Sequence, residues 1–269
     1  MYENIKVIAS DIDDTITPAA TDPNPYTVET VEKIRDKGIL FGLASGRPVD
    51  DVMNKFSLWG IRKQFDFIIG WNGGELYDNN TQTKYQFNFL KKEWIKEIIE
   101  FMSEFDAGIH MYLPNIYLSS VETDRAWFSA YKNHRKFQST NDLSDFYKKN
   151  NGGIMFRCKL SEMDRIHEKL KTLKDKEYVG FNTQPDLIEF SHKDSNKGYA
   201  LLKYLDMYNI KPEDCMSFGD TSNDNEMLRV SYGVCMLNGS DDTKKLAKVI
   251  TDRECKDDGF AHFIEDTLL

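Results

Sequence analysis

Three acidic side chains within four residues follow a short apolar run near the start of the chain. Asp11, Asp13 and Asp14 come directly after residues 5–10, whose β-branched, apolar character predicts a buried strand. Carboxylates this close repel one another, and a bound cation relieves that repulsion. A solvated loop or a helix cap is the alternative, which a single aspartate would favour. A helix-loop-helix calcium site is excluded because Ile16 stands where its loop needs glycine.

A second acidic turn follows another apolar run. Asp220 and Asp224 come directly after residues 215–218, which predict a strand. Their spacing of four predicts that both lie on one face of a starting helix. Helix capping explains one carboxylate there, but not two acidic strand ends in one sheet. Together the two turns would form a site made only of oxygen atoms, which suits Mg²⁺.

Two further motifs supply groups that bind anions. Ser45, Gly46 and Arg47 form a turn between a predicted strand and a predicted helix, where a hydroxyl and backbone N–H groups can hold a phosphate. Such turns are also common structural features. Lys197 stands near the start of another predicted helix. A lone lysine is normally a surface residue, but a cation is mildly unfavourable at a helix start, which slightly favours a role in a site.

The elements that must position these residues alternate between strand and helix. Strands at 5–10, 39–44 and 67–69 alternate with helices at 27–37 and 50–59, and the alternation resumes from residue 196. This pattern predicts an α/β fold with a Rossmann-like, doubly wound parallel sheet. Ligands of such sheets bind beyond the carboxyl ends of the strands, where the acidic turns and the Ser-Gly turn fall.

The middle of the chain follows a different pattern. Short strands and helices are mixed there, which predicts an α+β unit inserted into the first fold. We therefore expect a core formed by residues 1–83 and 191–269 and an inserted domain at 84–190. Four aromatic side chains are expected to belong to the core of the insert: Tyr112, Trp127, Phe128 and Tyr131.

Composition limits the classes of function. The 269 residues include 35 Lys and Arg against 44 Asp and Glu, and this net charge of −9 argues against general nucleic-acid binding. No apolar run reaches the roughly 18 residues of a membrane helix, and we expect no signal peptide. The four cysteines are scattered, which predicts reduced thiols in a cytoplasmic protein, and no histidine spacing indicates zinc. The oligomeric state is not indicated.

The ordered motifs resemble those of the haloacid dehalogenase superfamily, and most closely its Cof-like phosphatases of class IIB, which carry a large α/β cap. The chain departs from many members at Asp14, where they have glycine. Four segments match in order: Asp11–Thr15 the nucleophile loop, Ser45–Arg47 the second motif, Asn196–Gly198 the lysine motif and Gly219–Asp224 the acidic motif. Three pairs also fit recurring features: Asn72 with Gly73, Met236 with Asn238, and Asp258 with Gly259.

The resemblance implies a Mg²⁺-dependent phosphatase of small phosphorylated metabolites, with sugar phosphates as the expected substrates. Asp11 would attack phosphorus and form an aspartyl-phosphate, and Asp13 would act as general acid and then as general base. The metal ligands would be Asp11, the main-chain carbonyl of Asp13 and Asp220, with Asp224 orienting Lys197 or a metal-bound water. The phosphoryl oxygens would be held by Ser45, Gly46, Asn223 and Lys197. The insert would close over the site as a cap.

Two alternatives stay open on the sequence. A phosphotransferase or mutase would use the same core and differ only in passing the phosphoryl group to a hydroxyl. A non-catalytic phospho-signalling or metal-binding module is less favoured, because receiver domains run to about 120 residues without an insert. The second carboxylate, Asp13, also favours turnover over a lasting phosphoryl mark.

Overall fold

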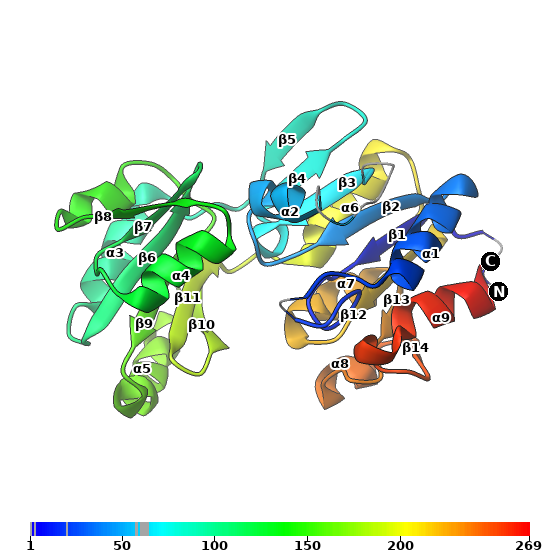
Figure 1. Cartoon of the computed structure of the whole chain (residues 1–269). Coiled ribbons are helices and arrows are strands. Elements are labelled where there is room, and N and C mark those ends of the chain that lie inside the picture. Colours follow the sequence, from blue (N-terminus) through cyan, green and yellow to red (C-terminus); the bar gives the residue numbers. More distant parts are fainter. Residues whose placement is uncertain (1, 3, 20, 57–58, 60–64) are drawn as a thin grey trace. The chain divides into compact units, whose positions relative to one another are not determined.

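The computed structural model describes residue 2 and residues 4–19, 21–56, 59 and 65–269. The chain divides into two units, one formed by Met1–Phe87 with Asn196–Leu269 and the other by Asn88–Ser195. The boundaries expected from the sequence, after residues 83 and 190, each fall a few residues earlier. Each unit contains its own sheet and its own hydrophobic core (Figure 1).

The first unit is built on an eight-stranded sheet with the order β14-β13-β12-β1-β2-β3-β4-β5. The strands from β14 to β3 are parallel, and the β4–β5 hairpin continues the sheet in antiparallel sense. The predicted parallel-sheet core is therefore confirmed. The strands are β1 Val7–Ser10, β2 Leu40–Ala44, β3 Phe67–Gly70, β4 Glu75–Asp78, β5 Thr83–Gln86, β12 Cys215–Gly219, β13 Tyr232–Cys235 and β14 Val249–Ile250.

Helices cover both faces of this sheet because the central strands are buried on both sides. Ile8 packs with side chains of α1, α2 and α9, whereas Val7 and Ala9 pack with those of α6 and α7. Apolar side chains that alternate along one strand therefore enter two different cores. The helices are α1 Pro25–Asp36, α2 Val49–Phe56, α6 Lys197–Met207, α7 Asn225–Val230, α8 Asp241–Leu246 and α9 Gly259–Thr267, with 3₁₀ turns η1 Trp71–Gly73, η5 Pro212–Asp214, η6 Ser222–Asp224 and η7 Cys255–Asp257.

The second unit has a six-stranded sheet with the order β10-β11-β9-β6-β7-β8. Its pairs are antiparallel except β7 with β8, and side chains of α3 and α5 pack on one face. Strand β8 was not expected from the sequence, because its residues are mostly polar. The elements are α3 Lys92–Met102, β6 Ala107–Leu113, β7 Ile116–Ser119, α4 Asp124–Lys132, β8 Lys136–Ser139, η2 Leu143–Tyr147, β9 Ile154–Cys158, η3 Leu160–Glu162, α5 Met163–Leu170, η4 Lys171–Leu173, β10 Tyr178–Gln184 and β11 Leu187–His192.

The expectation that the aromatic side chains of α4 form a core is wrong. Trp127, Phe128 and Tyr131 are 50%, 61% and 79% exposed. The helix turns Ala126 and Ala130 to the sheet instead, and both are buried. Small side chains on that face let the helix backbone approach the sheet closely, which directs the large side chains away from it.

A buried histidine of the second unit predicts a pH-dependent stability. His110 is 2% exposed, and burial lowers its pKa to about 4, assisted by the charge of Arg157. The unfolded chain takes up a proton near pH 6.5, so the free energy of unfolding falls as the pH drops from 6.5 towards 4. We expect the titration of His110 to lower the free energy of unfolding by about 2 kcal/mol at pH 5 relative to pH 7.5. Urea unfolding at the two pH values measures this difference.

The control for this prediction is His110→Gln, which does not titrate. Ser119 Oγ donates to the carbonyl of Val121, so His110 Nδ1, 3.1 Å away, must be the donor to Ser119 Oγ. Glutamine can still donate from its amide. The variant should lose about 2 kcal/mol less than the parent between the two pH values. An equal loss in both proteins would contradict the assignment.

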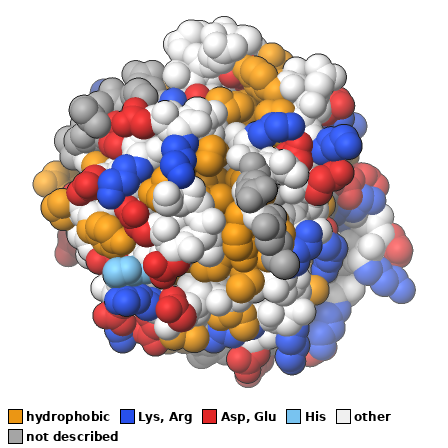
Figure 2. Space-filling model, turned by 90° about the vertical axis from the view of Figure 1, so that its right-hand side faces the viewer, with side chains coloured by type: hydrophobic (Ala, Val, Ile, Leu, Met, Phe, Trp, Pro, Cys, Tyr) orange, Lys and Arg blue, Asp and Glu red, His pale blue; other side chains and the backbone are white. Residues whose placement is uncertain are grey.

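The surface carries both signs of charge. On the face shown in Figure 2, hydrophobic side chains form a band, and charged side chains of both signs are interspersed around it. Among the helices in the described ranges, none is long and apolar enough to cross a membrane. The expectation that the chain does not bind nucleic acid stays a prediction.

Candidate active site

The carboxyl end of strand β1 places Asp11 between two other motifs. Ser10 is in register with Leu43 of β2 on one side and with Phe218 of β12 on the other. The next residue, Asp11, donates its backbone N–H to the carbonyl of Phe218 at 3.0 Å. The nucleophile loop, the Ser-Gly turn and the acidic turn therefore meet at one edge of the sheet, as parallel strands require.

Lys197 links two of the predicted carboxylates. Its ammonium lies 2.5 Å from Asp11 Oδ1 and 2.6 Å from Asp224 Oδ1, and its side chain is fully buried. Lys197 is the first residue of α6, and Asn196 caps the helix by accepting from the N–H of Tyr199 at 2.7 Å. The cap fixes the helix start, and the two ion pairs compensate the cost of burying the ammonium.

The site carries an excess of negative charge. Burial raises the pKa of Asp11 well above its usual value; Lys197 opposes this, and the carboxylates of Asp224 and Asp220 add to it. Burial and the charge of Asp224 raise the pKa of Asp220 to about 7. Burial alone would lower the pKa of Lys197, but Asp11 and Asp224 outweigh it and raise that pKa above its usual value. The protein thus holds these carboxylates where ionisation is costly.

The acidic turn is held by its own hydrogen bonds. Asp224 Oδ2 accepts from the backbone N–H groups of Asp220 at 3.0 Å and Thr221 at 3.2 Å. Thr15 donates its hydroxyl to Asp220 Oδ1 at 3.0 Å. The prediction that Asp220 and Asp224 share a helix face is wrong, because the helical turn η6 begins only at Ser222. The two carboxylates meet because Asp224 folds back towards Asp220.

Asp11, Asp220 and Asp224 could hold a metal ion. They offer carboxylate oxygens that lie within 4.8 Å of one another, and all three residues are buried. Lys197 balances one of the three negative charges. The two that remain match the charge of a divalent cation. The donors are all oxygen, so the set suits Mg²⁺ better than a softer metal. Asp224 already uses both oxygens for Lys197 and the turn, so its predicted role of orienting Lys197 fits this geometry.

Asp13 makes a different contact. Arg47 Nη2 lies 2.9 Å from Asp13 Oδ2 and 3.3 Å from Oδ1. The side chain of Asp13 is about one-third exposed. A guanidinium that contacts both carboxylate oxygens restricts the orientation of the carboxylate. The sequence had marked Arg47 as part of a motif but had not given it this partner.

The Ser-Gly turn keeps one backbone donor available. Ser45 Oγ accepts from the N–H of Arg47 at 3.2 Å, and the N–H of Ser45 donates to Ile69 at 2.9 Å. The N–H of Gly46 has no acceptor among the described residues. The predicted anion-binding group of this turn is therefore the N–H of Gly46, together with the hydroxyl of Ser45.

Asn238 supports the loop that follows the nucleophile. Its amide donates to the carbonyl of Asp14 at 2.8 Å and accepts from the N–H of Cys255 at 2.7 Å. Asp14 has a φ of 63°, in the left-handed region where glycine is favoured. The resemblance had singled out Asn238 and the departure at Asp14, but only the structure shows that the two residues touch.

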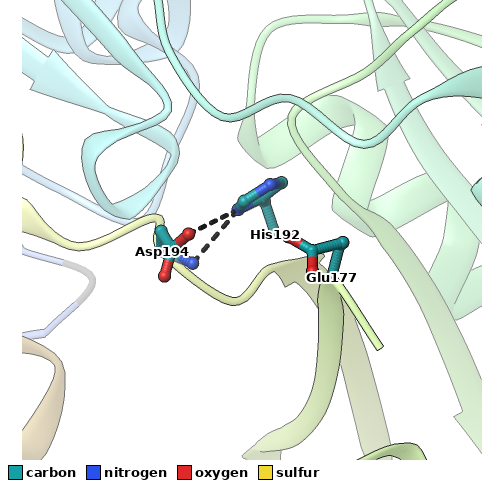
Figure 3. A group of neighbouring side chains, drawn as sticks. All are labelled: Glu177, His192 and Asp194. Carbon is teal, nitrogen blue, oxygen red and sulfur yellow. Dashed lines mark hydrogen bonds and ion pairs between the residues drawn. The ribbon is translucent and has the colours of Figure 1, made fainter. Parts of the chain in front are cut away.

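A second group of possible metal ligands lies in the other unit. Figure 3 shows Glu177, His192 and Asp194, whose ligand atoms lie within 4.8 Å of one another. The N–H of Asp194 donates to His192 Nδ1 at 3.1 Å, and Lys193 pairs with Glu177 at 2.9 Å. Glu177 and Asp194 are exposed, and Glu177 is already paired with a lysine. This group therefore lacks the buried excess of negative charge that Asp11, Asp220 and Asp224 carry.

Known proteins resemble the chain over almost its whole length. The family model of haloacid dehalogenase-like hydrolases matches residues 8–264. The 5-amino-6-(5-phospho-D-ribitylamino)uracil phosphatase YwtE of Bacillus subtilis is 24% identical and covers 98% of each chain. The HMP-PP phosphatase of Yersinia enterocolitica is 25% identical and covers 98% of this chain and 95% of its own.

A solved structure shows the same fold. The crystal structure of a haloacid dehalogenase-like hydrolase from Bacteroides thetaiotaomicron superposes with a TM-score of 0.86 at 24% identity, and the match covers 97% of this chain and 99% of that one. The fold and the family resemblance predicted from the sequence are both confirmed. The chain belongs to the haloacid dehalogenase-like hydrolase family and is a phosphatase.

Proposed function

We propose that this phosphatase depends on Mg²⁺ and hydrolyses small phosphate monoesters, sugar phosphates in particular, through an aspartyl-phosphate on Asp11. The observation that carries the proposal is the buried contact of Lys197 with Asp11 and Asp224, beside Asp220. A buried carboxylate in contact with one ammonium, in a site whose remaining negative charge favours a divalent cation, is suited to nucleophilic attack once that cation is bound.

The chemistry has two steps. A carboxylate oxygen of Asp11 attacks phosphorus, the bond from phosphorus to the leaving oxygen breaks, and Asp13 gives that oxygen a proton. Water then attacks the aspartyl-phosphate, Asp13 takes its proton, and inorganic phosphate leaves with Asp11 regenerated. Lys197 holds Asp11 Oδ1 at 2.5 Å, while Oδ2 accepts from no described residue.

The metal and the anion-binding groups offset repulsion between the phosphate and the carboxylates. Asp11, Asp220 and the main-chain carbonyl of Asp13 would hold Mg²⁺, which when bound supplies positive charge next to the phosphoryl group. Lys197 and the N–H of Gly46 would hold phosphoryl oxygens, together with Ser45 and Asn223. The second unit's role as a cap stays a prediction.

The substrate class rests on the curated relative from Bacillus subtilis. Its name places the phosphate on a ribityl chain, which is a sugar alcohol. We propose that this chain acts on a sugar phosphate, a class in which we include phosphorylated sugar alcohols. We also propose that it acts in the cytoplasm, where the four free cysteines would stay reduced. A transferase would instead pass the phosphoryl group from Asp11 to a sugar hydroxyl.

The test is phosphate release from a panel of sugar phosphates, nucleotides and an aryl phosphate, with Mg²⁺ and with chelator. We expect release with Mg²⁺, loss of release with chelator, and recovery when Mg²⁺ is added back. Mg²⁺ should also raise the melting temperature of the chelated protein, because a ligand that binds only the folded state stabilises it. Release that is unaffected by chelator would contradict the metal assignment. Consumption of the substrate that needs an added acceptor alcohol, and that forms the phosphate ester of that alcohol in place of inorganic phosphate, would favour the transferase.

A further inference from the structure

Asn72 lies in a strained turn beside the active-site residues. The turn η1 follows strand β3, and its residues Trp71, Asn72 and Gly73 have φ values of 51°, 48° and 100°. This left-handed conformation costs free energy at Trp71 and Asn72, which are not glycine. Such strain persists only where the surrounding structure imposes it. Asparagine tolerates this conformation better than most residues.

Backbone contacts fix the turn against two active-site segments. The N–H of Asn72 donates to the carbonyl of Ser45 at 3.0 Å, and that of Trp71 donates to the carbonyl of Arg47 at 2.9 Å. On the other side, a Cβ added at Gly73 would lie only 2.0 Å from the carbonyl oxygen of Asn196, the residue before Lys197. The turn therefore contacts both the Ser-Gly turn and the start of α6.

A chain of hydrogen bonds fixes the orientation of the Asn72 amide. The backbone N–H of Asp224 donates to the hydroxyl of Thr221, so that hydroxyl donates its own proton to Asn223 Oδ1 at 2.6 Å. Asn223 must then present its NH₂ group to Asn72, where it donates to Oδ1 at 3.3 Å. The remaining group, Nδ2 of Asn72, has two N–H donors and no acceptor among the described residues.

The Asn72 amide lies beside Gly46, the residue of the Ser-Gly turn whose N–H is available. A Cβ added at Gly46 would lie 3.3 Å from Asn72 Nδ2. The side chain of Asn72 is half-buried, so its donors remain accessible to a ligand. Asn72 contacts Ser45 and Asn223 and lies beside Gly46, and these are three of the residues to which the proposed function assigns phosphoryl oxygens.

We propose that Asn72 is a further phosphate-binding residue, which donates from Nδ2 to a non-bridging oxygen of the transferring phosphoryl group. This inference rests on the proposed function of the site. The proposal gives the strained turn a role, because the conformation that the carbonyls of Ser45 and Arg47 hold also places the amide beside Asn223 and Gly46. Loss of a donor to the phosphoryl group should lower the rate by the same factor for every substrate, because all substrates share that group. Loss of a donor to the leaving group should lower it by a factor that differs between substrates.

The test compares Asn72→Gly with the matched control Asn209→Gly. Asn209 lies in the same unit with a φ of 52°, so both variants place glycine in the left-handed region. Asn72→Gly should lower kcat/KM about 100- to 1000-fold, by the same factor for an aryl phosphate and a sugar phosphate, which is the loss expected for one donor to a developing anion. Asn209→Gly should leave kcat/KM unchanged, and both variants should keep the parent's melting temperature.

Two further measurements separate binding from a structural role. Inorganic phosphate, used as a product inhibitor, should bind more weakly to Asn72→Gly than to the parent. Asn72→Asp keeps the shape of the side chain and the contact with Asn223 but replaces the donor by a carboxylate, so its loss of activity should exceed that of Asn72→Gly. Unchanged phosphate inhibition in Asn72→Gly, or a loss confined to one leaving group, would overturn the proposal.

Failure of the proposed function would have a different signature. If the parent protein released no phosphate from any substrate, calorimetric binding of inorganic phosphate in Mg²⁺ would replace the kinetic assay. Weaker phosphate binding by Asn72→Gly than by the parent would then still support the assignment of Asn72. Equal binding, or no binding by the parent, would overturn it.

Discussion

Asp11→Asn should reduce phosphate release by a factor on the order of 10⁴ or more. An amide is a far poorer nucleophile than a carboxylate, and Asp11 is the residue whose oxygens would attack phosphorus. The geometry around the site should persist, because asparagine has the same shape. The measurement is single-turnover and steady-state phosphate release with the preferred substrate in Mg²⁺.

The control is Asp14→Asn in the same loop. Asp14 is exposed, accepts from the N–H of Ala19 at 3.0 Å, and makes no described contact with Lys197. Asparagine also tolerates its left-handed backbone, so this variant should keep its activity. Comparable losses in both variants would show that the loop, rather than the Asp11 carboxylate, determines the rate. Release by Asp11→Asn at a few per cent of the parental rate would also contradict the nucleophile assignment.

Lys197→Met should lower the free energy of unfolding by about 3 to 5 kcal/mol, the usual cost of removing one partner of a buried ion pair. Lys197 is fully buried between Asp11 and Asp224, so the change leaves two carboxylates without their cation. Activity should be lost as well. The measurement is urea unfolding with chelator present, which keeps a metal from replacing the lost charge.

Two companion variants test the cause of this loss. Lys203→Met changes an exposed lysine of the same helix and should shift the free energy of unfolding by no more than about 0.5 kcal/mol. The double variant Lys197→Met with Asp224→Asn removes one of the unpaired charges and should recover part of the stability but none of the activity. If Lys197→Met were as stable as Lys203→Met, the ion pairs would not contribute as described.

The local sequence was sufficient to predict most elements of the first unit. Strands β1, β2, β3 and β12 each begin and end within two residues of the predicted ranges. Buried parallel strands have short, almost continuous apolar runs, so local sequence identifies them well. Strand β8 was missed, and the aromatic side chains of α4 were assigned to the wrong face, because burial there depends on which neighbours the strand and the helix meet.

In the candidate site, too, some features could be predicted from the sequence and others depend on tertiary contacts. The types and order of the motifs were enough to bring Asp11, Lys197, Asp220 and Asp224 together, since strand ends of one parallel sheet meet at one edge. Distances and partners could not be read from the chain. Arg47 on Asp13 and Asn238 on Asp14 join residues that are 34 and 224 positions apart.

By itself, the sequence therefore determined the family, the sheet and the residues that carry chemistry, because these depend on local pattern and motif order. Only the tertiary structure decided how the charges are balanced. It buried one ammonium among three carboxylates and folded Asp224 back onto its own turn. It also gave Asn72 a strained backbone and amide donors that have no acceptor among the residues described. Those features arise from contacts between distant segments, whose energies depend on burial and geometry that no local pattern encodes.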